Sequence, residues 1–335
     1  MTTTSTAATP RATLGAYALS PSPDEDAGRA EAAFYEGLAE LTTAGGHRID
    51  ALELPLLPTG SPRIELPWIT RHVQPRWDLV VTCIPRVMTH LATLPAYGLA
   101  STDDDARRRA VADVAAVRDL AHSLADASGR PRITAIEVHT APGPDLGSLD
   151  ALARSFEEIL AWDLAGAQVL VEHCDAAVPG QAAAKGFFTL DDELAIVRDL
   201  PRSVGIGINW GRSAIEGRSA TTPVEHTRAA ADAGRLRAVI FSGASDVETP
   251  WGAPWRDAHI PAHSPDPALA ASSGSLLTQA TTSATLAAAG EHPHQDQPLY
   301  VGAKVSAPRS GADVRTRLAI ARASLGLALD APAVR

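Results

Sequence analysis

The chain has 335 residues, of which 45% are hydrophobic and 20% charged, and its formal net charge is −10. This composition is typical of a globular protein that buries a large core. The acidic balance argues against nucleic acid or an anionic membrane as the partner, because both require clustered positive charge. Cys83 and Cys174 are the only cysteines, so a disulfide framework is excluded, and Lys185 and Lys304 are the only lysines among many arginines.

The ends of the chain and its hydropathy suggest a compartment. No apolar run approaches the roughly 18 residues that a membrane span needs, and the first dozen residues lack the pattern of a secretory signal. We therefore expect a soluble, cytoplasmic protein. Residues 1–12 are expected to be a disordered tail, and residues 13–335 a single domain.

From residue 13 onward, short apolar segments alternate with longer amphipathic ones. In chain order, the predicted strands cover residues 13–20, 48–57, 77–85, 132–141, 167–176, 204–210, 236–242 and 299–308. The predicted helices cover residues 24–44, 103–128, 148–165, 191–200 with Thr189 as a cap, a segment from Thr222 onward, and 313–331. Near-continuous apolar strands separated by helices imply parallel pairing with both sheet faces covered.

Eight such units predict an α/β fold, the (β/α)8 TIM barrel, with an open doubly wound sheet as the alternative. No GxGxxG follows the first strand and no GxxxxGK[ST] occurs, so dinucleotide and P-loop sites lose their main support. The connections after strands 3 and 7, residues 86–101 and 243–275, are long. Connections of this length are usually lids or binding loops.

Polar residues gather where these apolar strands end. The set comprises Glu53, Thr82, Cys83, Glu137, His139, Glu172, His173, Asp175, Asn209, Trp210, Arg212, Ser242 and Lys304. In a TIM barrel the active groups come from the C-terminal ends of the strands and the loops that follow. The set predicts a small-molecule site, although salt bridges that only hold the barrel together remain the alternative.

Three segments resemble a known superfamily: VLVEHCDA at residues 169–176, GINWGRS at 207–213 and YVGAKVSAP at 300–308. They are similar to the xylose-isomerase-like TIM barrels, which include sugar isomerases, ketose epimerases, hydroxypyruvate isomerases and the endonuclease IV branch. The chain looks like a divergent branch of this superfamily. An endonuclease is disfavoured because the chain is acidic and lacks a multi-zinc ligand set at its strand ends.

The resemblance implies a Mg²⁺ or Mn²⁺ ion with four ligands. These are a Glu on strand five, an Asp on strand six, a His or Gln on strand seven and a Glu on strand eight. Glu172 matches the first of these positions, whereas Asn209, Ser242 and Lys304 stand at or near the others, and Arg212 stands where a substrate-binding His is usual. An ammonium group beside a divalent cation is strongly repelled. We therefore expect no metal at this position and no other cofactor.

The sequence leaves one alternative open for a metal. A displaced divalent ion, Mg²⁺ or Mn²⁺, is disfavoured by Asn209 and Lys304 but not excluded. Its candidate ligands are His173, Asp175, His226 and His259.

The predicted catalytic residues are Glu172, Lys304 and His173. Lys304 could supply a fixed positive charge that polarises a carbonyl or binds a carboxylate. Alternatively, Lys304 could react as a free amine with a carbonyl and form a Schiff base. A plain ion pair between Lys304 and Glu172 is the structural alternative. The predicted substrate-binding residues are Glu137, His139, Asp175, Lys185, Asn209, Trp210, Arg212, Ser242, Trp255, Asp257 and His259.

The segment DVETPWGAPWRDAHIP, residues 246–261, contains three of these binding residues: Trp255, Asp257 and His259. Indole rings stack on sugars and Arg grips carboxylates, although tryptophans also pack loops against a barrel rim. Asp257 and His259 form a candidate acid/base pair.

Together these features predict a sugar or sugar-acid isomerase or epimerase-like enzyme of carbohydrate metabolism that abstracts a proton beside a carbonyl. The alternatives are a non-catalytic carbohydrate-binding barrel and a Schiff-base lyase or aldolase that uses Lys304. The expected partner is a small carbohydrate or sugar acid. Barrels of this kind often pair through helices or long loops, so a homodimer stays open.

Overall fold

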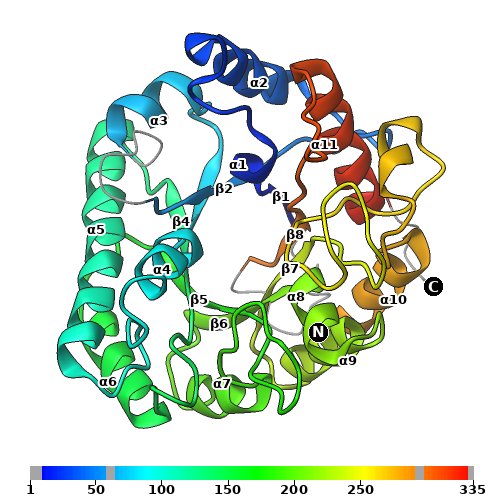
Figure 1. The fold of residues 1–335 in the computed structure, drawn as a ribbon. Coiled ribbons are helices and arrows are strands. Elements are labelled where there is room, and N and C mark those ends of the chain that lie inside the picture. Colours follow the sequence, from blue (N-terminus) through cyan, green and yellow to red (C-terminus); the bar gives the residue numbers. More distant parts are fainter. Residues whose placement is uncertain (1–9, 58–64, 291–297, 331–335) are drawn as a thin grey trace, which may run out of the picture.

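The computed structural model describes residues 10–57, 65–290 and 298–330, which form a closed barrel of eight parallel strands. The strands follow one another around the barrel in chain order, and β8 pairs with β1 to close it. Figure 1 shows the strands in the centre and the helices in a ring around them. The predicted (β/α)8 TIM barrel is confirmed, and the open doubly wound sheet is wrong.

Seven of the eight predicted strand segments contain a strand that is shorter than predicted, and the first segment overlaps its strand only at Thr13 and Leu14. The strands are β1 (Arg11–Leu14), β2 (Ala51–Pro55), β3 (Asp78–Thr82), β4 (Ile133–Val138), β5 (Gln168–His173), β6 (Val204–Asn209), β7 (Leu236–Phe241) and β8 (Tyr300–Ala303). Their residues are buried except for Arg11 and Thr134, which are half-buried. This explains the near-continuous apolar runs, because helices cover the outside and side chains fill the inside.

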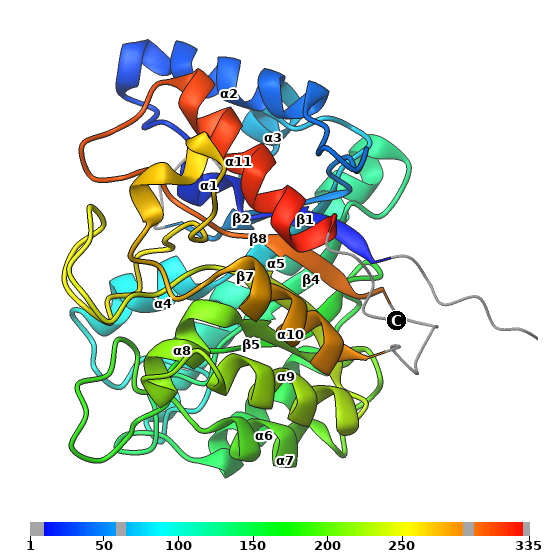
Figure 2. The same ribbon diagram turned by 90° about the vertical axis from the view of Figure 1, so that its right-hand side faces the viewer.

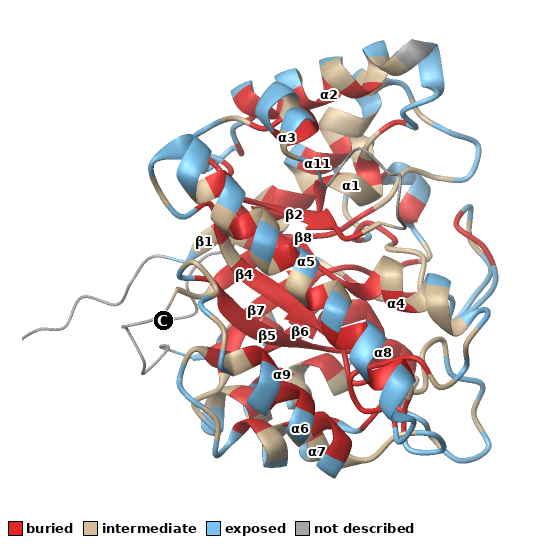
Figure 3. Ribbon diagram, turned by 90° about the vertical axis from the view of Figure 1, so that its left-hand side faces the viewer, coloured by how far each residue is buried: buried red, intermediate tan, exposed pale blue. Residues whose placement is uncertain are grey.

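The helices surround the barrel, with their exposed residues on the outside and their buried residues toward the strands (Figure 3). They are α1 (Ala16–Leu19), α2 (Arg29–Glu40), α3 (Leu66–His72), α4 (Ile84–Leu91), α5 (Asp104–Ser128), α6 (Leu149–Leu160), α7 (Leu190–Val197), α8 (Trp210–Gly217), α9 (Thr222–Asp232), α10 (Gln279–Ala289) and α11 (Val314–Leu329), with 3-10 helices at Glu25–Gly28 and Pro267–Ser272. The six predicted helices are confirmed, and Thr189 caps α7 through a capping box. No helix in the described ranges is long and apolar enough to cross a membrane.

The first predicted strand had the wrong boundaries. β1 covers Arg11–Leu14, so residues 11 and 12 belong to the barrel and not to a tail, while residues 1–9 lie outside the described residues. After Leu14 the chain turns at Gly15 into α1 instead of continuing as a strand. The turn passes close to Lys304, because a Cβ on Gly15 would lie 2.7 Å from Lys304 Cγ.

Replacing Gly15 with alanine is therefore expected to destabilise the protein by about 1–3 kcal/mol, the usual cost of forcing an extra methyl into a packed core. Gly207→Ala is the matched control, because its Cβ would meet nothing closer than Ala238 Cβ at 3.4 Å. Urea denaturation of both variants measures the difference. Equal stability of the two variants would argue against the close packing of Gly15 on Lys304.

The connections after β3 and β7 also differ from the prediction. Residues 86–101 are not simply a loop, because α4 begins at Ile84 directly after the strand. The connection after β7 is long as predicted, but a 3-10 helix lies within residues 243–275 and the unpredicted α10 follows it. β6 ends at Asn209, one residue before the predicted end of the sixth strand, because Trp210 begins α8.

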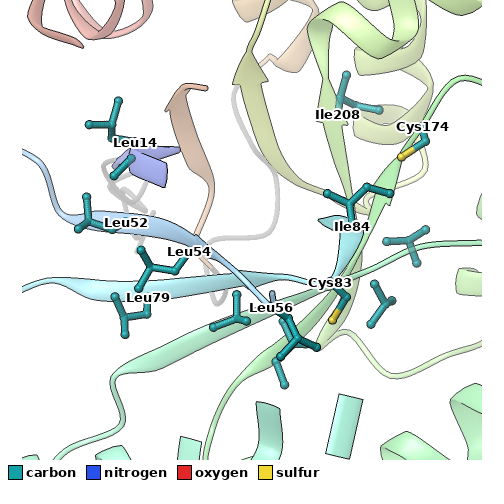
Figure 4. Close-up of a cluster of buried hydrophobic side chains, with 14 of the residues drawn as sticks. Leu14, Leu52, Leu54, Leu56, Leu79, Cys83, Ile84, Cys174 and Ile208 are labelled. Carbon is teal, nitrogen blue, oxygen red and sulfur yellow. The ribbon is translucent and has the colours of Figure 1, made fainter. Parts of the chain in front are cut away.

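The core lies in two places. The larger part fills the space between strands and helices, in one cluster that runs from Leu52, Leu54 and Leu79 to Leu56 and Cys83 (Figure 4). The smaller part fills the inside of the barrel and consists of Ala51, Val80, Ala135, Leu170, Ala238, Ile240 and Tyr300. This inner layer shows which residues of β2, β3, β4, β5, β7 and β8 point into the barrel.

Candidate functional site

Polar side chains lie on the inside of the barrel directly above this inner apolar layer. Side chains two residues apart in a strand share a face. The residues two positions after Ala51, Val80, Ala135 and Leu170 are Glu53, Thr82, Glu137 and Glu172, and all four are buried. The barrel therefore changes from apolar to polar along its axis, toward the C-terminal ends of the strands.

Lys304 follows the end of β8 and has no solvent exposure. Its Nζ lies 2.5 Å from Glu53 Oε1 and 3.6 Å from Glu172 Oε1, and 5.3 Å from the centre of the Tyr17 ring. Burial alone would lower the pKa of Lys304, but Glu172 and Glu53 raise it well above its usual range. Lys304 is therefore an ammonium ion, and its nearest partner is Glu53, not the Glu172 that the sequence suggested.

Glu172 is surrounded by donors. Its Oε1 accepts a hydrogen bond from Asn209 Nδ2 at 3.2 Å, and its Oε2 accepts from His139 Nε2 at 2.8 Å and pairs with Arg212 Nη1 at 2.7 Å. Burial would raise the pKa of this carboxyl group, but Arg212 and Lys304 hold it well below its usual range. Glu172 is thus a permanent carboxylate whose two oxygens are both engaged.

The charges continue from Arg212 into the loops. Arg212 Nε lies 3.3 Å from Asp257 Oδ2, and Lys185 Nζ lies 3.0 Å from the same oxygen. Burial would raise the pKa of Asp257, but Lys185, His259 and Arg212 hold it well below its usual range. The result is a continuous line of alternating charges that we call the ion-pair chain: Glu53, Lys304, Glu172, Arg212, Asp257 and Lys185.

The ion-pair chain carries three acidic and three basic groups, so their charges cancel when all six are ionised. Burial raises the pKa of Glu53, and the Lys304 ammonium opposes that shift. Such a balance is required, since removing charges from water costs several kcal/mol per ion unless they are paired. Both lysines of the protein are members. Lys185 comes from the connection after β5 and Asp257 from the connection after β7, so their ion pair joins two loops over the end of the barrel.

Two neutral groups lie beside the ion-pair chain. Burial, together with Glu53 and Glu172, raises the pKa of Glu137 well above its usual range, so this residue is a neutral acid. Burial lowers the pKa of His139 to about 4, so its ring is neutral. Because the Glu172 carboxylate can only accept, the His139 proton resides on Nε2 and leaves a lone pair on Nδ1.

Glu137 and His139 stand two residues apart at the end of β4, so both face the inside of the barrel. Glu137 Oε2 and His139 Nδ1 are both buried and have no hydrogen-bond partner among the described residues. Buried polar atoms are rarely left without a partner. A protonated Glu137 can donate a hydrogen bond and His139 Nδ1 can accept one, so both atoms are free to contact a bound molecule.

Three other predicted binding residues, Ser242, His259 and Asp175, form hydrogen bonds within the protein. Ser242 Oγ and His259 Nδ1 are 2.8 Å apart, while His259 Nδ1 lies 3.6 Å from Asp257 Oδ1. Burial lowers the pKa of His259 to about 4. Asp175 Oδ2 accepts hydrogen bonds from the backbone of Ala184 and Lys185, so it shapes the connection after β5.

The two predicted tryptophans contact protein groups. Trp210 is fully buried and donates from Nε1 to Thr285 Oγ1 at 3.1 Å, which makes it part of the packing between α8 and α10. Trp255 is half-buried, and the Arg218 guanidinium lies 5.0 Å from its ring centre. Only Trp255 has a surface that a ligand could reach.

His173 lies apart from the other predicted catalytic residues. It follows Glu172 directly, and neighbouring strand residues point to opposite faces, so it points out of the barrel. Its Nδ1 is 2.8 Å from Glu193 Oε2 and its Nε2 is 3.1 Å from Glu216 Oε2. Burial would lower the pKa of His173, but Glu193 and Glu216 raise it to about 10. The prediction placed His173 in the interior cluster, and the structure does not.

The four positions that the resemblance assigns to a metal do not suit one. Of Glu172, Asn209, Ser242 and Lys304, only Glu172 is a carboxylate, whereas Mg²⁺ and Mn²⁺ favour several oxygen ligands, carboxylates above all. Both Glu172 oxygens already contact cationic or amide donors. The Lys304 ammonium occupies the region where a divalent ion would need a further anionic ligand.

Solved structures with the same architecture identify the class of barrel. D-psicose 3-epimerase with D-tagatose from Clostridium cellulolyticum H10 superposes with a TM-score of 0.54 at 16% identity, over 94% of this chain and 96% of that one. A putative xylose isomerase from Rhodospirillum rubrum gives 0.58 at 13% identity over 97% and 99%. The IolI protein with a bound zinc atom gives 0.55 at 10% identity over 95% and 97%. The protein therefore has the fold of the xylose-isomerase-like TIM barrels.

Sequence similarity defines the family more narrowly. Residues 13–320 match the family described as Domain of unknown function (DUF4862), and the chain belongs to this family. It is also 32% identical over 320 residues to Uncharacterized protein STM3670 of Salmonella typhimurium strain LT2, which covers 94% of this chain and 95% of the relative.

Proposed function

We propose that this protein is a sugar or sugar-acid isomerase or epimerase-like enzyme that moves a proton beside a carbonyl without a divalent metal at Glu172. The observation that carries the proposal is a pair of buried atoms without a hydrogen-bond partner among the described residues, His139 Nδ1 and Glu137 Oε2. They belong to two neutral groups beside the Lys304 and Arg212 cations. The barrels described as a psicose epimerase and a putative xylose isomerase support the same substrate class.

In the proposed reaction, the lone pair of His139 Nδ1 accepts a proton from the carbon next to the substrate carbonyl. The resulting imidazolium is stabilised by Glu172, whose Oε2 already accepts the Nε2 proton. Lys304 stabilises the negative oxygen that develops on the former carbonyl, in the manner of a fixed electrophile. Glu137 then delivers a proton to the substrate, and transfer of a proton from His139 back to Glu137 restores both groups.

Substrate binding would use the basic members of the ion-pair chain. Arg212 offers a planar fork that suits a carboxylate, and Lys185 offers a second positive charge. The side chains of Lys185 and Asp257 are only 11% and 9% exposed, so a ligand reaches the interior after this loop-to-loop pair has separated. Ser242, His259 and Trp255 are then available to contact sugar hydroxyl groups and ring faces.

The proposal is tested by proton exchange in D₂O. Ketoses, aldoses and sugar acids are incubated with the protein, and NMR follows deuterium incorporation at the carbon beside the carbonyl. His139→Gln is expected to slow the exchange by about 10²–10⁴-fold, the usual contribution of a general base. His122→Gln is the control, since His122 is a half-buried residue of α5 whose Nε2 lies 2.9 Å from the backbone oxygen of Asp163 and contacts none of the ion-pair chain. Full exchange in the His139 variant would exclude the assigned base.

A non-catalytic carbohydrate-binding barrel is the second candidate, and the internal neutrality of the ion-pair chain favours it. This candidate predicts saturable sugar binding without any deuterium incorporation. A Schiff-base lyase is less compatible, because Lys304 is held as an ammonium ion and the reaction requires a free amine. Borohydride trapping of substrate on Lys304 would nevertheless establish it, and stoichiometric Mg²⁺ or Mn²⁺ bound to Glu172 would contradict the metal-free reaction.

A further inference from the structure

A second cluster of ionisable side chains lies outside the barrel wall, between β5, α8 and α9. His173 ends β5, Glu216 lies on α8 and His226 lies on α9, and these two helices are side by side in both views of the fold (Figures 1 and 2). One nitrogen or oxygen atom from each of the three residues lies within 4.8 Å of those of the other two.

The distances within this cluster match a metal site. His173 Nε2 lies 3.1 Å from Glu216 Oε2, and His226 Nε2 lies 3.7 Å from Glu216 Oε1. Ligand atoms of a tetrahedral zinc ion, with bonds of about 2.0–2.1 Å, are separated by about 3.3 Å. The separation at His226 is too long for a hydrogen bond, so Glu216 does not satisfy that ring nitrogen.

Both histidines are oriented as metal ligands usually are. The other nitrogen of His173, Nδ1, lies 2.8 Å from Glu193 Oε2, and His226 Nδ1 lies 3.1 Å from Ser213 Oγ. Glu193 in turn accepts a hydrogen bond from Thr140 Oγ1 at 2.8 Å. Metal-binding histidines almost always donate their second N–H to a carboxylate or another acceptor, which fixes the ring and its tautomer. Each histidine therefore presents Nε2 toward Glu216.

The charge of the cluster is also suited to a divalent ion. Glu193 and Glu216 bring two negative charges, and Glu193 is fully buried at the side chain. An imidazolium at His173 compensates one of them, whereas a divalent cation compensates both. The side chains of Glu216 and His226 are 14% and 15% exposed, so an ion can reach the cluster from the surface.

We propose that His173, Glu216 and His226 bind one divalent transition-metal ion such as Zn²⁺. This site is separate from the ion-pair chain inside the barrel. Two imidazole nitrogens and one carboxylate are a ligand set that Zn²⁺ accepts, with the remaining position left to solvent. Binding exchanges the Nε2 proton of His173 for the metal. The ion ties the end of β5 to α8 and α9 and holds the wall of the barrel behind Glu172.

The experiment uses the full-length, tag-free protein after chelation and dialysis, with ZnCl₂ as the probe. Isothermal titration is expected to show one Zn²⁺ per chain, and thermal unfolding is expected to shift to higher temperature as Zn²⁺ is added. Co²⁺ in place of Zn²⁺ should give the visible absorption of a low-symmetry site with nitrogen and oxygen ligands.

Variants separate the proposed ligands from their supporting residue. His226→Gln and Glu216→Gln are expected to weaken Zn²⁺ binding by more than about 100-fold, and Glu193→Gln by about 10–100-fold, the range observed when the acceptor behind a metal-bound histidine is removed. His122→Gln is the matched control and should bind like the original protein. Circular dichroism checks that each variant is folded, and Glu216→Gln replaces His226→Gln if the latter fails.

Two results would overturn the site. One is the absence of any Zn²⁺ binding or thermal shift in the original protein. The other is unchanged binding in both folded ligand variants, which would place the ion elsewhere. Neither result bears on the proton-exchange test of His139, because that test concerns the inside of the barrel.

Discussion

Lys304→Met is expected to destabilise the folded protein by about 3–5 kcal/mol at neutral pH, the usual cost of removing one partner from a buried ion pair. Lys304 has no exposed surface, and it compensates both Glu53 and Glu172. Lys304 is also the group that stabilises the negative oxygen in the proposed reaction. The structure predicts that both turnover and stability are lost.

A second substitution distinguishes charge from packing. Glu53→Gln combined with Lys304→Met removes the nearest carboxylate together with the ammonium, so the double variant should recover a large part of the lost free energy of unfolding. Lys185→Met is the matched control, because its partner Asp257 keeps a second cation in Arg212. Urea denaturation of the original protein, the single variants Lys304→Met and Glu53→Gln, and the double variant gives the coupling energy. A single Lys304 variant within about 1 kcal/mol of the original protein would contradict a tightly coupled buried pair.

The fold was predictable because its signals are local. Apolar strand runs alternate with helical segments, and the polar residues at the strand ends face one another once the barrel closes. The errors arose where tertiary contacts decide. Gly15 turns the chain because Lys304 lies beneath it, and α10 is rich in Ala and Thr without a clear apolar stripe. Tyr17 was missed because it lay in a segment predicted as strand.

The partners within the site were less predictable. Strand periodicity alone assigns Glu172 and His173 to opposite faces, so the separation of these two residues could have been found from the sequence. The pairing of Lys304 with Glu53 could not, because the residues are 251 positions apart and meet only through barrel closure. Glu216 was missed because α8 was not predicted, and without it the histidines of the outer cluster lack their common partner.

Glu137→Gln is expected to have opposite effects on stability and activity. Burial raises the pKa of Glu137, and the carboxyl group is therefore neutral at pH 7. Glutamine is neutral at every pH. The variant should therefore be more stable at pH 7, by about 0.5–2 kcal/mol, the usual gain when a functional residue is relieved of strain or charge. If Glu137 is the proton donor, the same variant should lose about 10²–10⁴-fold in deuterium exchange.

The sign of the pH dependence makes this prediction specific. Because the folded pKa of Glu137 is raised, its contribution to stability is fully present below about pH 4.3, the usual pKa of glutamate, and is lost as the pH rises through the folded value. The advantage of Glu137→Gln over the original protein should be absent near pH 4 and should grow toward neutral pH. Glu157→Gln, on the exposed face of α6, should show no such trend. A glutamine variant that is less stable at pH 7 would mean that Glu137 is ionised and paired, which would exclude it as the acid.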